Sequence, residues 1–81
     1  MPEVFRLFGF SFFFYSKEHE PIHIHIEGSD GYAIFDFDNI NNKFIERECH
    51  NLKAGDKRKI IDAIEERKQE IIDKWNEHFN K

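Results

Sequence analysis

The chain has 81 residues, enough for one small domain, which we expect to span residues 1–81. It carries 12 basic and 16 acidic residues, a net charge of −4, with no basic stripe or tail, which disfavours general nucleic-acid binding but leaves a local RNA site open. The single cysteine, Cys49, excludes an internal disulfide, and the lack of a signal peptide or a long apolar run predicts a cytoplasmic protein with no membrane segment.

Five short strands are predicted in the first 49 residues, because apolar and polar residues alternate there with the period of a strand. The predicted strands are Val4–Phe8, Phe10–Tyr15, Ile22–Glu27, Tyr32–Phe37 and Lys43–Cys49. The connections between them are short, and one contains Asp30-Gly31, a pair that favours hairpin turns. Short connections favour an antiparallel meander, since parallel strands need long crossovers. Nine of the ten phenylalanines precede residue 45, so most of the core should lie in this half.

The second predicted strand is apolar on both faces. Phe12 and Phe14 share one face, while Phe13 and Tyr15 share the other. Such a strand is expected to be central in the sheet, or to meet another subunit with one face.

A helix is predicted from about Asp56 to Phe79, where apolar residues recur at helical spacing. Its buried stripe should comprise Ile60, Ile64, Ile71 and Trp75. A continuous helix of that span would be roughly 35 Å long, which exceeds a compact domain of this size. The sequence therefore predicts an α+β fold, a four- or five-stranded antiparallel meander sheet packed against one long C-terminal helix, and a homodimer or a small partner protein that covers the excess apolar surface.

The segment 18–27 holds three of the five histidines and is the strongest candidate for a functional site. If Ile22, Ile24 and Ile26 enter the core, then His23, His25 and Glu27 form a row on the opposite face, and His19 folds back toward it from the loop before Pro21. The predicted catalytic residues are His19, His23, His25 and Glu27, with histidine acting as acid and base. The three histidines are also candidate ligands for a divalent metal such as zinc. The alternative is an exposed sheet face with satisfied histidines.

Other polar residues carry weaker signals. A hairpin around residues 28–31 would bring Tyr32 close to the histidine row, where its hydroxyl could bond a histidine or a carboxylate. Asp36 and Asp38 share one face of the fourth strand, which is typical of a strand entering a turn. Cys49 fits a small core residue or a bystander better than a nucleophile, and no glycine-rich phosphate loop is present.

Several motifs together resemble the small bacterial domain-of-unknown-function family numbered 4160. They are Met1–Arg6, Phe13–Ser16, the run Glu18–Ile26 and a late Trp75 in the C-terminal helix. This sequence departs from the family at Ile22, where a second proline is common. The family has no established activity. The resemblance implies one half of a toxin–antitoxin-like pair, because members often lie beside a gene for a second small domain.

Two functional hypotheses follow. The first is a partner-binding module of a two-protein pair, with a histidine-rich functional face. The second is a small metal-dependent or histidine-driven hydrolase or ribonuclease. The acidic charge balance argues mildly against a free-standing ribonuclease, which has to attract a polyanion.

Overall fold

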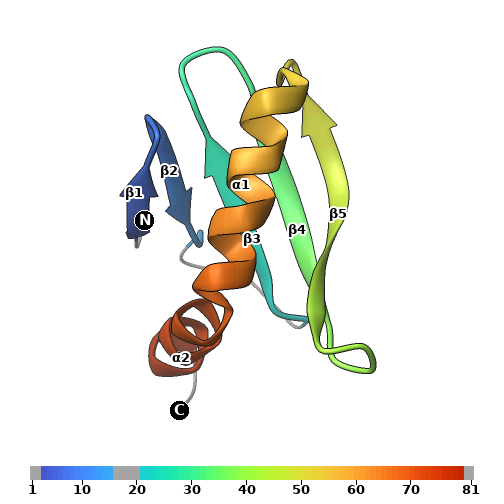
Figure 1. The fold of residues 1–81 in the computed structure, drawn as a ribbon. Helices are drawn as coiled ribbons and strands as arrows, with labels where there is room; N and C mark the ends of the chain where they lie inside the picture. Colours follow the sequence, from blue (N-terminus) through green and yellow to red (C-terminus); the bar gives the residue numbers. More distant parts are fainter. Residues whose placement is uncertain (1–2, 16–20, 80–81) are drawn as a thin grey trace.

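The computed structural model describes residues 3–15 and 21–79, which form five strands followed by two helices (Figure 1). The elements are β1 (Glu3–Leu7), β2 (Phe10–Phe13), β3 (His23–Glu27), β4 (Tyr32–Asp38), β5 (Lys43–His50), α1 (Ala54–Glu66) and α2 (Lys68–Phe79). No helix of the described residues is long and apolar enough to cross a membrane.

The five strands form one sheet in the order β1-β2-β3-β4-β5, and every neighbouring pair is antiparallel. This confirms the predicted meander and the α+β class. One irregularity lies between β4 and β5, where the register shifts so that Arg47 is an extra residue. Such a bulge strengthens the local twist of the strand.

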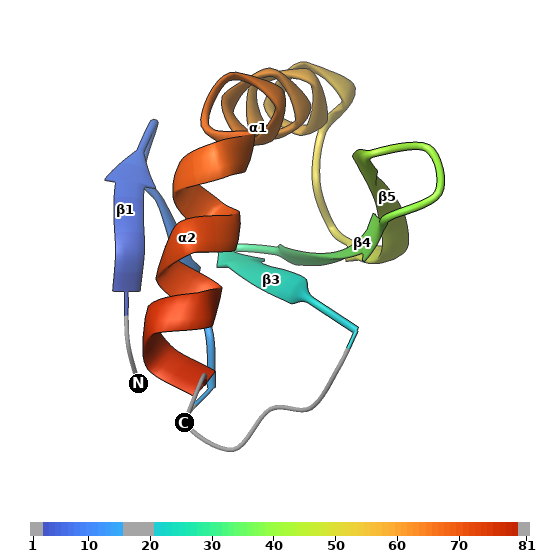
Figure 2. The same ribbon diagram turned by 90° about the horizontal axis from the view of Figure 1, so that it is seen from below.

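The core fills the space between the sheet and the helices. Ile24, Ile26 and Phe35 are almost completely buried and pack with Ile60 and Ile64 of α1 in one cluster. Figure 1 shows α1 lying across one face of the sheet, and Figure 2 shows α2 running beside β1 and β2. Both helices therefore cover the same face of the sheet.

The helical region follows the predicted span but is not continuous. We expected one long helix from about Asp56, whereas α1 begins at Ala54 and ends before Arg67, and α2 follows at a steep angle (Figure 2). Arg67 leaves helical geometry, with φ −110° and ψ 24°, while its N–H still bonds the Ala63 carbonyl. Because the chain bends at Arg67, a helical segment that would be too long for the domain if straight packs onto the sheet as two shorter helices.

The bend preserves the predicted buried stripe. Ile60, Ile64, Ile71 and Trp75 are all at most 2% exposed, although they belong to two helices. Trp75 packs edge-on against Phe14, with ring centroids 5.2 Å apart. The buried residues of both helices therefore pack into the same hydrophobic core.

Candidate functional site

The sheet face turned away from the helices, which we call the open face, carries two cross-strand rows of side chains. The first row is Phe13, His25, Ile34 and Glu48, and the second is Ser11, Glu27, Tyr32 and His50. Directly opposite residues of antiparallel strands project to the same side and interact. Four strands therefore combine aromatic, imidazole and carboxylate groups on one surface.

His23 begins β3 and is buried, with only 7% of its surface exposed. The pairing of β2 with β3 ends at Phe13 and His25, so the strands part beyond that point. The ring of Trp75 lies 5.2 Å from the His23 ring, and His23 Nδ1 is 2.8 Å from the Pro21 carbonyl oxygen. An Nδ1–H donor to that carbonyl fixes the orientation of the imidazole. His23 therefore belongs to the packing between α2 and the sheet.

His25 is half-buried and lies in a cluster of rings on the open face. Its imidazole stacks on Phe13 with centroids 5.5 Å apart, and Tyr15 meets it edge-on at 4.5 Å. The His23 ring also meets the His25 ring edge-on, with centroids 5.4 Å apart. The His25 imidazole therefore contacts both the buried rings of Phe13 and His23 and the exposed ring of Tyr15.

Tyr32 and Glu48 form a hydrogen-bonded pair on β4 and β5. The Tyr32 hydroxyl donates to Glu48 Oε2 at 2.6 Å, so the tyrosine bonds a carboxylate of β5. Glu48 raises the pKa of Tyr32, because the carboxylate accepts a bond from the neutral phenol and repels the phenolate. The Tyr32 ring also stacks on His50 at 5.5 Å. Tyr32 is thus held over the sheet in a defined orientation.

Between these groups the open face is hollowed. The hollow has a volume of about 380 Å³ and runs between the His25 ring cluster and the Tyr32–Glu48 pair, with Ile34 in its lining. Glu27 contributes a second carboxylate to it. The hollow is open to solvent and is not an enclosed cavity, which suits the binding of a partner side chain, whereas a substrate pocket buries most of its ligand.

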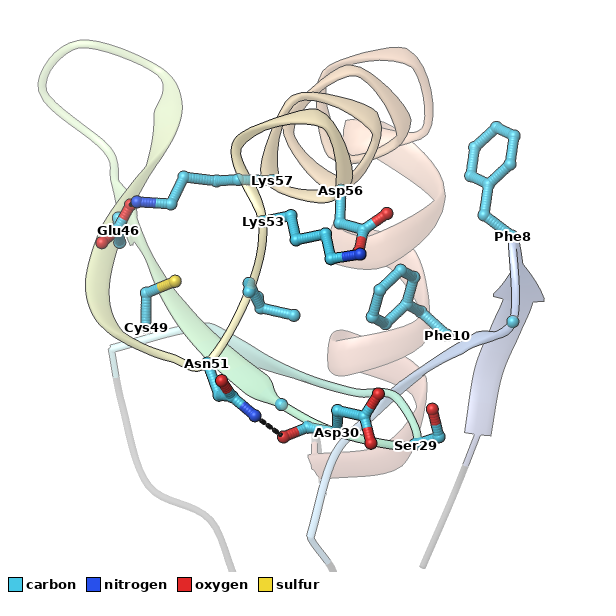
Figure 3. Close-up of a pocket in the computed structure, with 13 residues that line it drawn as sticks. Phe8, Phe10, Ser29, Asp30, Glu46, Cys49, Asn51, Lys53, Asp56 and Lys57 are labelled. Atoms are coloured by element: carbon cyan, nitrogen blue, oxygen red, sulfur yellow. Dashed lines mark hydrogen bonds and ion pairs between the residues drawn. The ribbon is translucent and has the colours of Figure 1, made fainter.

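A larger cavity of about 700 Å³ lies at one end of the sheet, beside the start of α1 (Figure 3). Two contacts there tie elements together. Lys57 of α1 forms an ion pair with Glu46 at 3.3 Å, and Asn51 Nδ2 donates to the Asp30 carbonyl at 2.7 Å. Half-buried Cys49 lines the same cavity. The ion pair joins β5 to α1, and the hydrogen bond joins the segment after β5 to the β3–β4 turn.

A family model described as "Domain of unknown function (DUF4160)" matches residues 9–76. The chain belongs to this family. The match covers β2 to β5, α1 and most of α2. Among curated proteins and among solved structures, no match was found.

The predicted site residues of this DUF4160 protein have different surroundings. His23 is buried, His25 is half-buried on the open face and Glu27 is exposed there, while His19 lies outside the described residues. Within residues 3–15 and 21–79, no group of three or more histidine, cysteine or acidic side chains is arranged to hold a metal ion. His23, His25 and Glu27 share one face of β3 in the strand register, as expected, but His23 packs against Trp75.

Sequence reasoning did not single out three residues of the open face. The sequence predicts Tyr15 only as part of a strand face that could meet another subunit, and it predicts no site role for Glu48 or His50. Their positions follow from strand register, since Glu48 lies opposite Ile34 and His50 opposite Tyr32. The bulge at Arg47 sets this register, and a sequence pattern of period two carries no signal of a bulge.

Proposed function

We propose that this DUF4160 protein is the partner-binding component of a two-protein, toxin–antitoxin-like bacterial pair, and that the open face is its contact surface. The observation that carries the proposal is the set of large apolar side chains left accessible there. Tyr15, Ile45 and Tyr32 are 49%, 44% and 36% exposed, on the side of the sheet opposite the core. Clustered exposed aromatic and aliphatic groups on a rigid scaffold are typical of protein interfaces.

The open face is also rigid enough to serve as a docking surface. Tyr32 is anchored by Glu48, and Asp36 is held by Arg47 through contacts of 2.7 to 3.2 Å. Side chains ordered before binding lose less conformational entropy when a partner arrives. The face therefore combines accessible apolar groups with a fixed polar frame.

Co-elution with the product of the neighbouring gene tests the proposal. We expect a stable complex in size-exclusion chromatography with light scattering, and we expect Tyr15→Ala or Ile45→Glu to weaken it by about tenfold or more, as loss of an interface anchor does. Ile40→Glu is the matched control, because Ile40 is 89% exposed but lies in the β4–β5 turn. The proposal is contradicted if no complex forms, or if Ile40→Glu weakens the complex as much as Ile45→Glu. A dimer of the chain alone that Ile45→Glu dissociates would identify a second copy as the occupant.

The hydrolase alternative has less support from the geometry. Of the four predicted catalytic residues, His25 and Glu27 are the two in the described chain that reach the open surface, and His23 is engaged in packing. Zinc titration of the wild type and of the His23→Ala/His25→Ala double variant tests its metal-dependent form. Equal weak binding by both proteins would reject a metal site at these histidines.

A further inference from the structure

We propose that the hollow of the open face binds a positively charged side chain, the guanidinium of an arginine on a basic segment of the partner protein. The inference rests on the proposed partner-binding function and specifies the chemistry of that partner. Two kinds of group line the hollow and attract cations: carboxylates and the faces of aromatic rings.

The carboxylates differ in how they are neutralised across the open face. At its margins, Glu3 pairs with Arg6 at 3.1 Å and Asp36 pairs with Arg47 at 2.7 Å. In the described part of the chain, the structure gives neither Glu27 nor Glu48 an ion pair. The middle of the face therefore carries two negative charges that no arginine or lysine within residues 3–15 and 21–79 pairs with.

Glu48 retains the capacity to bind a guanidinium. Its bond from Tyr32 involves Oε2 and leaves Oε1 available, and an ionised carboxylate accepts up to about four hydrogen bonds. The Tyr32 bond also restrains the position of the Glu48 carboxylate. A restrained carboxylate at the rim of a hollow favours the parallel, two-point contact that arginine makes.

The rings provide the second attraction. Tyr15, Phe13 and His25 form one wall, and Tyr32 contributes the opposite one. A cation over a ring face is stabilised by the negative charge of its π-system. The protein already uses this contact elsewhere, because the Arg67 guanidinium lies 4.6 Å from the centre of the Phe5 ring. A guanidinium that enters the hollow would meet the same chemistry on a surface that also carries carboxylates.

The charge of the hollow selects among macromolecules. The phosphates of a nucleic acid would be repelled by Glu27 and Glu48, although its bases could stack on the rings. A basic peptide matches both the rings and the carboxylates, and the net charge of −4 adds a long-range attraction. The occupant that fits is therefore a basic protein segment.

Nuclear magnetic resonance titration with an acetylated hexa-arginine amide tests the inference, with the hexa-citrulline peptide as neutral isostere. We expect shifts at Tyr15, His25, Tyr32 and Glu48 with the arginine peptide, and none with citrulline. The Glu27→Gln/Glu48→Gln variant should bind about tenfold more weakly, as expected for lost charge-assisted hydrogen bonds. The matched control is Glu65→Gln/Glu66→Gln on α1, which removes the same charge from exposed positions and should leave the affinity within about twofold once screened by salt.

Tyr15→Leu separates the ring contribution from charge, since it keeps an apolar side chain and the net charge; we expect a severalfold loss of affinity. Shifts spread over α1 and α2, equal losses in both double variants, or oligouridine binding at the hollow in preference to hexa-arginine would overturn the inference.

The two proposals fail separately. A complex with the neighbouring gene product that survives Glu27→Gln/Glu48→Gln refutes the arginine site and leaves the contact surface standing. Localised hexa-arginine binding without that complex supports the hollow and refutes the pair.

Discussion

On β4, Phe35 and Ile34 are neighbours in the chain but lie on opposite faces of the sheet. Phe35 is 3% exposed beneath α1, whereas Ile34 is half-buried between His25 and Glu48. The same alternation on β3 sends Ile24 into the core and His25 to the open face. One backbone pattern therefore supplies both surfaces, and the helices determine which of them becomes the core.

This comparison implies that the two faces contribute to different properties. Side chains of the covered face should affect stability, because each loses many packing contacts when truncated. Exposed side chains of the open face, such as Tyr15 and Tyr32, should affect association, because they remain accessible in the folded chain. Substitutions on the two faces can therefore be told apart by measuring both quantities for each variant.

Trp75→Ala should have the largest effect, a loss of about 3–5 kcal/mol in the free energy of unfolding. The indole is 1% exposed and contacts Phe14, His23 and Phe79. For so small a domain this loss can abolish folding. Urea unfolding followed by circular dichroism measures it, with Trp75→Phe as a milder companion. An unchanged midpoint for Trp75→Ala would place the tryptophan outside the core.

Adjacent residues of β3 give a sharper comparison. Ile24→Ala should cost about 2–5 kcal/mol, since Ile24 is fully buried. His25→Ala should cost about 1 kcal/mol or less, because part of its ring faces solvent. The loss of affinity for the partner should show the reverse order: among the folded molecules, His25→Ala should weaken binding more than Ile24→Ala. Equal destabilisation by both substitutions would show that the open face is as structural as the core.

Acidic residues on the open side of β4 and β5 should also divide into structural and binding groups. Asp38 accepts a bond from the Asn41 side chain and further bonds from the Asn41 and Ile40 N–H groups, and these bonds lower the pKa of Asp38. A lowered folded-state pKa gives stability that is present above the ordinary aspartate pKa, ~3.9, and is lost as the pH falls through the folded value. Asp38→Ala should therefore be less stable than wild type at neutral pH, with a gap that narrows in acid. Melting temperatures of both proteins between pH 7 and pH 2.5 measure this difference. A difference that does not change with pH would show that the ionised Asp38 carboxylate does not stabilise the turn.

The smallest predicted effect concerns Tyr32. Glu48→Gln should lower the pKa of Tyr32 toward its ordinary value, because a neutral amide accepts a weaker hydrogen bond from the phenol than a carboxylate does and does not repel the phenolate. Carbon-13 labelling of the tyrosine rings follows this titration directly. Glu65→Gln on α1 serves as the control and should leave the Tyr32 titration unchanged. An unaltered Tyr32 titration in Glu48→Gln would mean that the hydrogen bond does not persist in solution.

Much of the fold could be predicted from the sequence because the periods are strong. Alternation predicted the five strands, the short connections predicted the meander, and helical spacing predicted the buried stripe of Ile60, Ile64, Ile71 and Trp75. The apolar stripe is interrupted at Arg67 and Lys68, where the structure bends, but an interrupted stripe does not by itself distinguish a bend from a straight helix with polar residues. The excess length of the predicted helix was the physical indication that the span is not straight.

The candidate site was less predictable. Placing His25 and Glu27 on the face opposite Ile24 and Ile26 needed only the strand period, and the structure places them so. The burial of His23 depends on the parting of β2 and β3 and on the position of Trp75, both of which are long-range features. Likewise, Glu48 reaches Tyr32 because the bulge at Arg47 sets the register. Local patterns carry no information on such contacts.

The most direct test of the central claim is a nuclear magnetic resonance footprint of the chain on addition of the neighbouring gene product. If the open face is the contact surface, signals of Tyr15, His25, Tyr32 and Ile45 should shift or broaden, while exposed positions of α1 such as Ile61 stay unchanged. A footprint on α1, or on the cavity beside Cys49, with an unperturbed open face would contradict the account.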